Sequence, residues 1–168
     1  MAKPFSDVAP RGLDQAIAEL RRWITDGDYL SPVPLSNALQ HIYTLEESSK
    51  RDLGDKEYYS IRNADPKGQV VAGIVFARAR VTHFGAVVED LEGQRPFTLG
   101  RSTLDGGDVL DGRGVTLRWR PRADLPRGRP ERHGRDEHYD QRVDGRDVVD
   151  TLEEAREFFT AIQSEQED

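Results

Sequence analysis

Residues 70–84 have the sequence VVAGIVFARARVTHF, in which the most apolar run of the chain is followed at once by Arg78, Arg80 and His83. This stretch decides the fold, because residues 69–90 can be interpreted in two ways. As a helix, the apolar residues recur at steps of four, three, four, three and four, which gives a single apolar seam. As a strand, the β-branched residues are favoured and alternation places both arginines on one face. We favour the helix, whereas a strand would place a sheet at the centre of the fold.

Other segments also have apolar residues at helical spacing. Residues 13–24 and 35–45 each form an apolar stripe, and the short connection between them predicts an antiparallel pair of helices. Residues 147–163 predict a C-terminal helix, which either Asp150 or Thr151 could cap. Between these helices, the sequence EYYSIRNADPKG fits a short strand or a helix, followed by a turn at NADPKG.

The middle of the chain has a different composition. Residues 91–121 contain many glycines and two short apolar alternations, at 95–99 and 115–120, which predict small strands. Residues 122–138 combine prolines, glycines and alternating charges, so we expect a mobile loop that folding does not require. The expected fold class is therefore α+β, with N-terminal helices, a small antiparallel sheet in the middle and a C-terminal helix.

Length and composition limit the classes of protein to consider. The 168 residues suffice for one core, and we expect a single domain over residues 1–168 whose first part, 1–90, is mainly helical. The net charge of -7 argues against stable binding of double-stranded DNA, which needs many cationic contacts to phosphate. The chain has no cysteine, so disulfides and thiolate chemistry are excluded while the redox compartment stays open. No apolar run has the length of a signal peptide or a membrane span, and we expect a cytoplasmic protein.

The residues that follow the apolar run could act on RNA. A guanidinium binds phosphate through two parallel hydrogen bonds, and an imidazole that titrates near neutral pH can move a proton from a 2′-hydroxyl. On one helix Arg78 and His83 would lie about 140° apart, whereas Arg80 and His83 would be neighbours. We take Arg78, Arg80 and His83 as the candidate catalytic residues, and this chemistry needs neither a cofactor nor a metal. The alternative is that both arginines only solvate the end of a core element.

An arginine followed after four residues by a histidine, on or beside a helix, resembles the motif of the HEPN superfamily. These small helical proteins include metal-independent ribonucleases of toxin and defence systems. The resemblance covers residues 10–90 as a pattern of helices. It implies that Arg78 and His83, usually contributed by two subunits, bind and cleave the RNA backbone. The family commonly has Asn directly after the arginine, where this chain has Ala79, and a member that only binds RNA would show such a change.

Two functions follow from the sequence. One is a HEPN-like ribonuclease or RNA-binding protein that forms a homodimer through the helix of residues 69–90. The other is a non-catalytic interaction or regulatory module, whose acidic surface and Arg/Pro-rich loop contact a protein partner.

His133 and His138 lie among acidic residues but lack the spacing of a zinc site on a helix. Trp119 is expected to fill the core.

Overall fold

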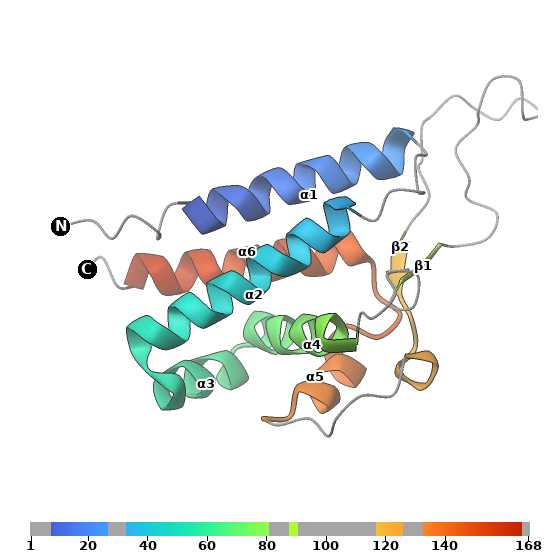
Figure 1. Cartoon of the computed structure of the whole chain (residues 1–168). Helices are drawn as coiled ribbons and strands as arrows, with labels where there is room; N and C mark the ends of the chain where they lie inside the picture. Colours follow the sequence, from blue (N-terminus) through green and yellow to red (C-terminus); the bar gives the residue numbers. More distant parts are fainter. Residues whose placement is uncertain (1–7, 27–32, 81–87, 91–116, 126–132, 166–168) are drawn as a thin grey trace, which may run out of the picture.

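The structure is a computed structural model that describes residues 8–26, 33–80, 88–90, 117–125 and 133–165. Within these ranges the chain is built almost entirely of helices (Figure 1). In chain order the elements are α1 (Val8–Asp26), α2 (Val33–Leu53), α3 (Asp55–Ala64), α4 (Pro66–Arg80), β1 (Val88–Asp90), β2 (Leu117–Trp119), the 3-10 helix η2 (Arg122–Asp124), α5 (Arg135–Arg142) and α6 (Val148–Glu165).

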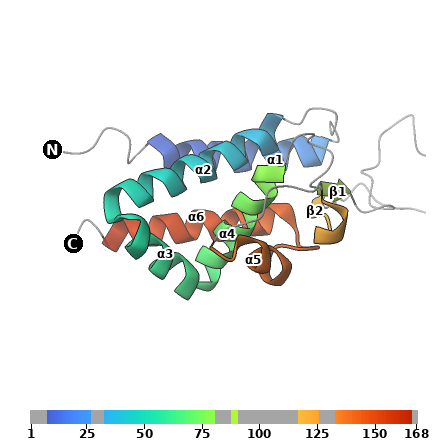
Figure 2. The same cartoon turned by 60° about the horizontal axis from the view of Figure 1, so that its bottom comes forward.

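The apolar run quoted above forms α4, and this helix lies at the centre of the molecule. In both views α4 lies between α5 on one side and α2 and α6 on the other (Figures 1 and 2). Every residue from Val70 to Ala77 is buried, so α4 has no solvent-facing side along that length. The helical interpretation is confirmed as far as Arg80. Residues 88–90 pair as a strand, so the expected helix does not reach residue 90, and residues 81–87 lie outside the described residues.

The turn that starts α4 follows from the sequence NADPKG. Asp65 has an extended backbone and ends α3, and its Oδ1 accepts hydrogen bonds from the backbone N–H groups of Lys67, at 2.6 Å, and Gly68, at 3.1 Å. Pro66 occupies the first position of α4, where a helix does not require an N–H donor. The preceding aromatic segment is helical, because it forms α3.

The long helices α1, α2 and α6 form the remaining walls of the core. The stripe residues Leu13, Ile17 and Leu20 of α1 are buried, and so are those of α2. The α1 and α2 helices pack against each other, as their spacing predicted, and α6 contacts α1, α2 and α4 (Figure 1). No helix in the described ranges is both long and apolar enough to cross a membrane.

The expected α+β fold class was wrong, because the described part of the chain is nearly all helical. Its strand content is one antiparallel pairing of three residues each, with Val88 opposite Trp119. Leu117 and Trp119 do alternate with the exposed Arg118, as in a half-buried strand. However, the two strands form no larger sheet within the described residues. Instead β2 docks on a helix, since Trp119 is fully buried and its Nε1 donates to Thr151 Oγ1 of α6 at 2.7 Å. The strand expected at 95–99 lies outside the described residues.

The loop expected over residues 122–138 is in part helical where the structure describes it. That the segment is mobile and dispensable for folding stays a prediction. Residues 135–142 form α5, which packs closely against α4. Tyr139 anchors α5, because its side chain is fully buried and packs on Phe76, with 5.2 Å between the ring centroids. Its hydroxyl donates a hydrogen bond to the carbonyl of Arg120 at 2.6 Å. Arg122 of η2 pairs with Asp136 and Asp140 of α5. The segment therefore folds around one aromatic side chain, and residues 126–132 lie outside the described residues.

The predicted C-terminal helix is present as α6, but its cap differs from the expected one. Asp147 Oδ1 accepts the backbone N–H of Asp150 at 3.0 Å, which makes Asp147 the capping residue. Thr151 lies inside the helix, where its hydroxyl donates to the backbone carbonyl of Val148 at 2.8 Å and accepts the indole N–H of Trp119. The expected burial of Trp119 is confirmed.

We expect Gly73→Ala to destabilise the protein, because α4 and α5 approach each other at this position. A Cβ on Gly73 would lie 2.5 Å from Val143 Cγ2 and 3.0 Å from Tyr139 Cα. Overpacking costs about 1–3 kcal/mol, while the better helix propensity of alanine offsets at most about 1 kcal/mol. Urea unfolding should therefore show a net loss of stability. Combined with Val143→Ala, the two changes should be non-additive by about 0.5 kcal/mol or more. An unchanged or increased unfolding free energy for Gly73→Ala would contradict the close contact.

Candidate functional site

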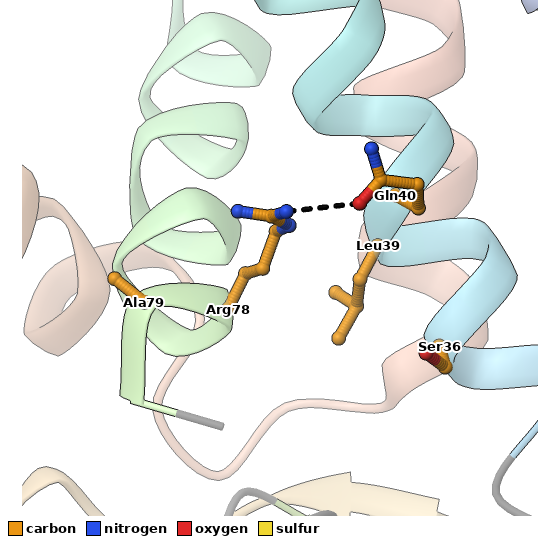
Figure 3. A pocket seen from close by; sticks show the side chains of 5 residues that line it. All are labelled: Ser36, Leu39, Gln40, Arg78 and Ala79. Carbon is orange, nitrogen blue, oxygen red and sulfur yellow. Dashed lines mark hydrogen bonds between the residues drawn. The ribbon is translucent and has the colours of Figure 1, made fainter. Parts of the chain in front are cut away.

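Arg78 lies in the last turn of α4, where burial ends and the helix reaches the surface. Its side chain extends across to α2, and Nη2 donates to Gln40 Oε1 at 2.9 Å (Figure 3). The guanidinium carbon lies 4.1 Å from the centroid of the Tyr43 ring. Gln40 and Tyr43 are three residues apart on α2 and so share one face of that helix. The guanidinium is therefore held at two points, by an amide oxygen and an aromatic ring.

An open pocket lies beside this arginine, between α2 and α4. It has a volume of about 380 Å³ and is lined by Ser36, Leu39, Gln40, Arg78 and Ala79 (Figure 3). Leu39 is almost completely buried, whereas Ser36, Gln40 and Ala79 are exposed. The pocket thus combines an apolar base with polar groups and one cation at its rim.

The electrostatic setting of Arg78 differs from that of the structural arginines. Arg62, Arg122 and Arg156 each pair with carboxylates. Within the described part of the chain, Arg78 has an amide oxygen and an aromatic face as its partners and no carboxylate. Neither partner neutralises the guanidinium. Its full positive charge therefore faces the pocket, which suits an anion such as phosphate.

The structure does not bring the two candidate arginines together. Two residues along a helix turn the side chain by about 200°. Arg80 accordingly lies on the side away from Arg78, with its guanidinium carbon 3.5 Å from the Phe76 ring centroid and Nη1 3.4 Å from the Phe76 carbonyl oxygen. Arg122 approaches the same ring at 5.8 Å. His83 lies outside the described residues, so its position relative to either arginine stays a prediction.

A second polar cluster, which the sequence did not reveal, lies in the interior between α2, α3 and α5. The Glu46 side chain is fully buried, and its Oε1 accepts from Arg62 Nη1 at 3.1 Å. Both Glu46 oxygens accept from Arg135 Nη2, at 3.2 and 3.3 Å, and Lys50 Nζ lies 3.4 Å from Oε2. One buried carboxylate thus joins cations from three helices.

Aromatic rings surround this cluster. The Tyr59 ring is stacked on His133, with centroids 4.1 Å apart and planes inclined by 14°, and Arg62 lies over Tyr59 at 4.8 Å. Burial, and next the charge of Glu46, raise the pKa of the Tyr58 hydroxyl far above its ordinary value, so that it stays protonated. His133 has a left-handed backbone with φ 62°, and its carbonyl accepts from Arg62 Nη2 at 3.2 Å. These contacts bind the start of α5 to α3, which identifies the cluster as a structural tie.

Sequence reasoning missed this tie for a definable reason. Glu46 directly follows Leu45 of the apolar stripe, so its position on the buried side of α2 could have been noticed. Apart from Lys50 on the same helix, its cationic partners are 16 and 89 residues away, so no local pattern pairs Glu46 with them. Among the described residues, no three His, Asp or Glu side chains come together as a metal site would require, and that includes His133 and His138.

Comparisons with protein-family models, with curated proteins and with solved structures found no match to this chain. A proposal for the function of this protein therefore rests on the geometry around Arg78.

We expect Glu46→Gln to be severely destabilising, because it leaves the buried Arg62 and the partly buried Arg135 without their carboxylate. Breaking a buried ion pair by removing one partner costs about 3–5 kcal/mol. The matched control is Glu47→Gln, which removes the next carboxylate on α2. This carboxylate is half exposed, and Lys50 is its partner among the described residues. An exposed pair contributes at most about 1 kcal/mol. Equal unfolding free energies for the two variants in urea would show that the buried tie is not needed.

The stability should also fall in mild acid because of His138. Burial, and next the charge of Arg62, lower the pKa of His138 below its ordinary value of 6.5, and its buried Nδ1 has no hydrogen-bond partner among the described residues. The unfolded chain therefore takes up the proton first as the pH falls. The unfolding free energy should decrease from about pH 7 downward and level off once the folded-state pKa is passed. His138→Gln should flatten this dependence between pH 7.5 and 5, and identical slopes for both proteins would exclude His138 as the cause.

Proposed function

We propose that this protein is a HEPN-like, metal-independent ribonuclease or RNA-binding protein in which Arg78 binds a backbone phosphate. The observation that supports this is the charge of Arg78, which is oriented by Gln40 and Tyr43 and left without a carboxylate within the described residues. In a chain with net charge -7, an arginine held in this way at a pocket is suited to an anionic ligand.

The proposed reaction uses residues of the chain alone. Arg78 holds the phosphate and stabilises the charge that builds up on its oxygens. His83 takes the proton of the 2′-hydroxyl as the 2′-oxygen bonds to phosphorus. The bond from phosphorus to the 5′-oxygen breaks, and the protonated His83 gives its proton to that leaving oxygen. The products are a 2′,3′-cyclic phosphate and a free 5′-hydroxyl.

Two protomers are expected to complete one site. Arg78 and Arg80 of one chain face opposite sides of α4, so a single phosphate cannot meet both guanidinium groups of that chain. By the helical spacing expected from the sequence, His83 would be a neighbour of Arg80 rather than of Arg78. A dimer that joins the ends of two α4 helices would bring Arg78 of one protomer to His83 and Arg80 of the other.

The first experiment is an RNA cleavage assay in EDTA. We expect wild-type protein to cleave single-stranded RNA, and His83→Ala to be slower by about 10²–10⁴-fold, which is the usual contribution of a general acid or base. Arg78→Ala should be slower by about 10²-fold or more, because it loses the charge that stabilises the transition state. Arg51→Ala is the control, since Arg51 is an exposed arginine at the opposite end of α2 and should leave the rate unchanged.

The outcomes of this assay distinguish a ribonuclease from a protein that only binds RNA and from a protein that does neither. RNA that binds without being cleaved would identify a binding-only protein, consistent with Ala79 in place of Asn. RNA that neither binds nor is cleaved would reject this proposal and leave a protein–protein interaction or regulatory module.

A mixing experiment tests the shared site. Arg78→Ala and His83→Ala proteins are each expected to be inactive, but a mixed dimer contains one site with both residues intact. After subunit exchange, an equimolar mixture should recover about a quarter of the wild-type activity, because half of the dimers are mixed and each has one working site of two. Active wild-type protein with no recovery in the mixture would show that each site lies within one chain.

A further inference from the structure

We infer that the ring of His133 is a platform on which one base of a single-stranded RNA stacks, while a phosphate of the same strand binds Arg78. This rests on the proposed function, because both contacts belong to one strand. His133 lies just before α5, and its ring is stacked on Tyr59 of α3, with centroids 4.1 Å apart and planes inclined by 14°. Tyr59 covers one face of the ring, while His133 as a whole is exposed. A second flat group can therefore stack on the other side.

The His133 ring is held in place before any ligand arrives. Arg62 is fully buried and pairs with Glu46, and its Nη2 donates to the His133 carbonyl at 3.2 Å. The His133 backbone is left-handed, with φ 62°, a conformation that costs energy for a residue other than glycine and persists where the surroundings hold it. A ring fixed in this way loses little conformational freedom when a ligand binds.

The ligand suited to this ring is a base rather than a phosphate. The nearby cations Lys50 and Arg62 both pair with Glu46, so neither is left with a free charge as Arg78 is. A flat aromatic ring offers its π face instead. Every base has such a face, and stacking on aromatic side chains is the sequence-tolerant contact by which proteins bind single-stranded RNA. A base within a duplex is already stacked on both sides, so the platform suits single strands.

One face of α2 connects this platform with Arg78. Tyr43, Glu47 and Lys50 are spaced by four and three residues, so they share that face. Tyr43 contacts Arg78, and Lys50 Nζ lies 5.3 Å from the centroid of the Tyr59 ring. In Figure 1, α2 accordingly runs from near the end of α4 to α3. The seven residues from Tyr43 to Lys50 advance about 10 Å along the helix, and a nucleic-acid strand advances about 3.4 Å or more per nucleotide. The two contacts are thus a few nucleotides apart on one strand.

The test measures how much the bases of a strand contribute to its binding. A 2′-fluoro uridine hexamer, U6, which cannot be cleaved, is compared with an abasic hexamer that has the same number of phosphates. Binding is followed by fluorescence anisotropy at one fixed salt concentration. Wild-type protein should bind U6 about 5-fold more tightly than the abasic strand or more, which is the lower end of the contribution of one stacked base. His133→Ala should bring this ratio close to one.

Three further variants assign the effect. His133→Phe should restore the ratio, because a phenyl ring stacks as an imidazole does. Arg78→Ala should weaken both strands by a similar factor, because a phosphate contact does not depend on the base. The matched control is His41→Ala, which removes a histidine that packs against α1 at Gly12 and should change neither affinity.

Glu47 tests the path of the strand independently. Its carboxylate is half exposed on the α2 face between the two contacts, where it would repel the phosphates of a strand that lies over it. Glu47→Gln should therefore tighten the binding of U6 and of the abasic strand alike at low salt, where charges are screened least. Unchanged affinity for both strands would show that RNA does not follow this face, and would overturn the connection of the platform with Arg78.

The results distinguish failure of this inference from failure of the proposed function. Binding of neither strand would overturn both. Equal binding of U6 and the abasic strand, weakened by Arg78→Ala, would overturn the platform and leave the phosphate site. A preference for U6 that survives His133→Ala, or that His133→Phe fails to restore, would also overturn the platform.

Discussion

The packing of α4 on all sides is the constraint on which the rest of this structure depends. Its sequence has no polar face between Val70 and Ala77, so the helix is stable in water only where other elements cover it. The α2 and α6 helices cover one side, and α3 and α5 cover the other. The α5 helix has few apolar residues of its own, and it holds its place through Tyr139 and through the approach that Gly73 permits.

The same constraint determines where a functional group can lie on α4. A charged side chain can be accommodated only at the end of the helix, and Arg78 is the first residue there whose side chain reaches water. Its direction is then set by α2, since Tyr43 and Gln40 hold the guanidinium. The site is therefore part of the packing of two rigid helices rather than of a loop, which favours a fixed geometry.

The long, periodic helices could be predicted from the sequence, and the short elements could not. The stripes of α1, α2 and α6 are amphipathic, and the pattern of α4 was correctly interpreted as a helix despite its β-branched residues. The error in fold class came from Leu117 to Trp119, where alternation is real but the partner surface is α6. The α5 helix was missed because a single tyrosine carries its packing and its charges resemble those of a solvated loop.

The candidate site was predictable only in part. That Arg78 follows a core helix is visible in the sequence, but the contribution of Ser36 and Gln40 depends on how α2 packs across α4. The opposite directions of Arg78 and Arg80 follow from helical period once the helix is known. The Glu46 tie could not be foreseen, because it depends on contacts across 16 and 89 residues.

The late position of α5 and α6 in the chain has a consequence for synthesis on the ribosome. When α4 has been made, 54 more residues must be added before Arg135, the first residue of α5, is reached. At about 5–20 residues per second this takes roughly 3–11 s, during which the surfaces of α4 that α5 and α6 later cover stay exposed. A nascent chain in that state is open to aggregation and is a natural client of chaperones that bind apolar helices. Slow decoding between the two helices would lengthen the exposure, so the yield of folded protein in a cell is coupled to the speed of translation over residues 81–134.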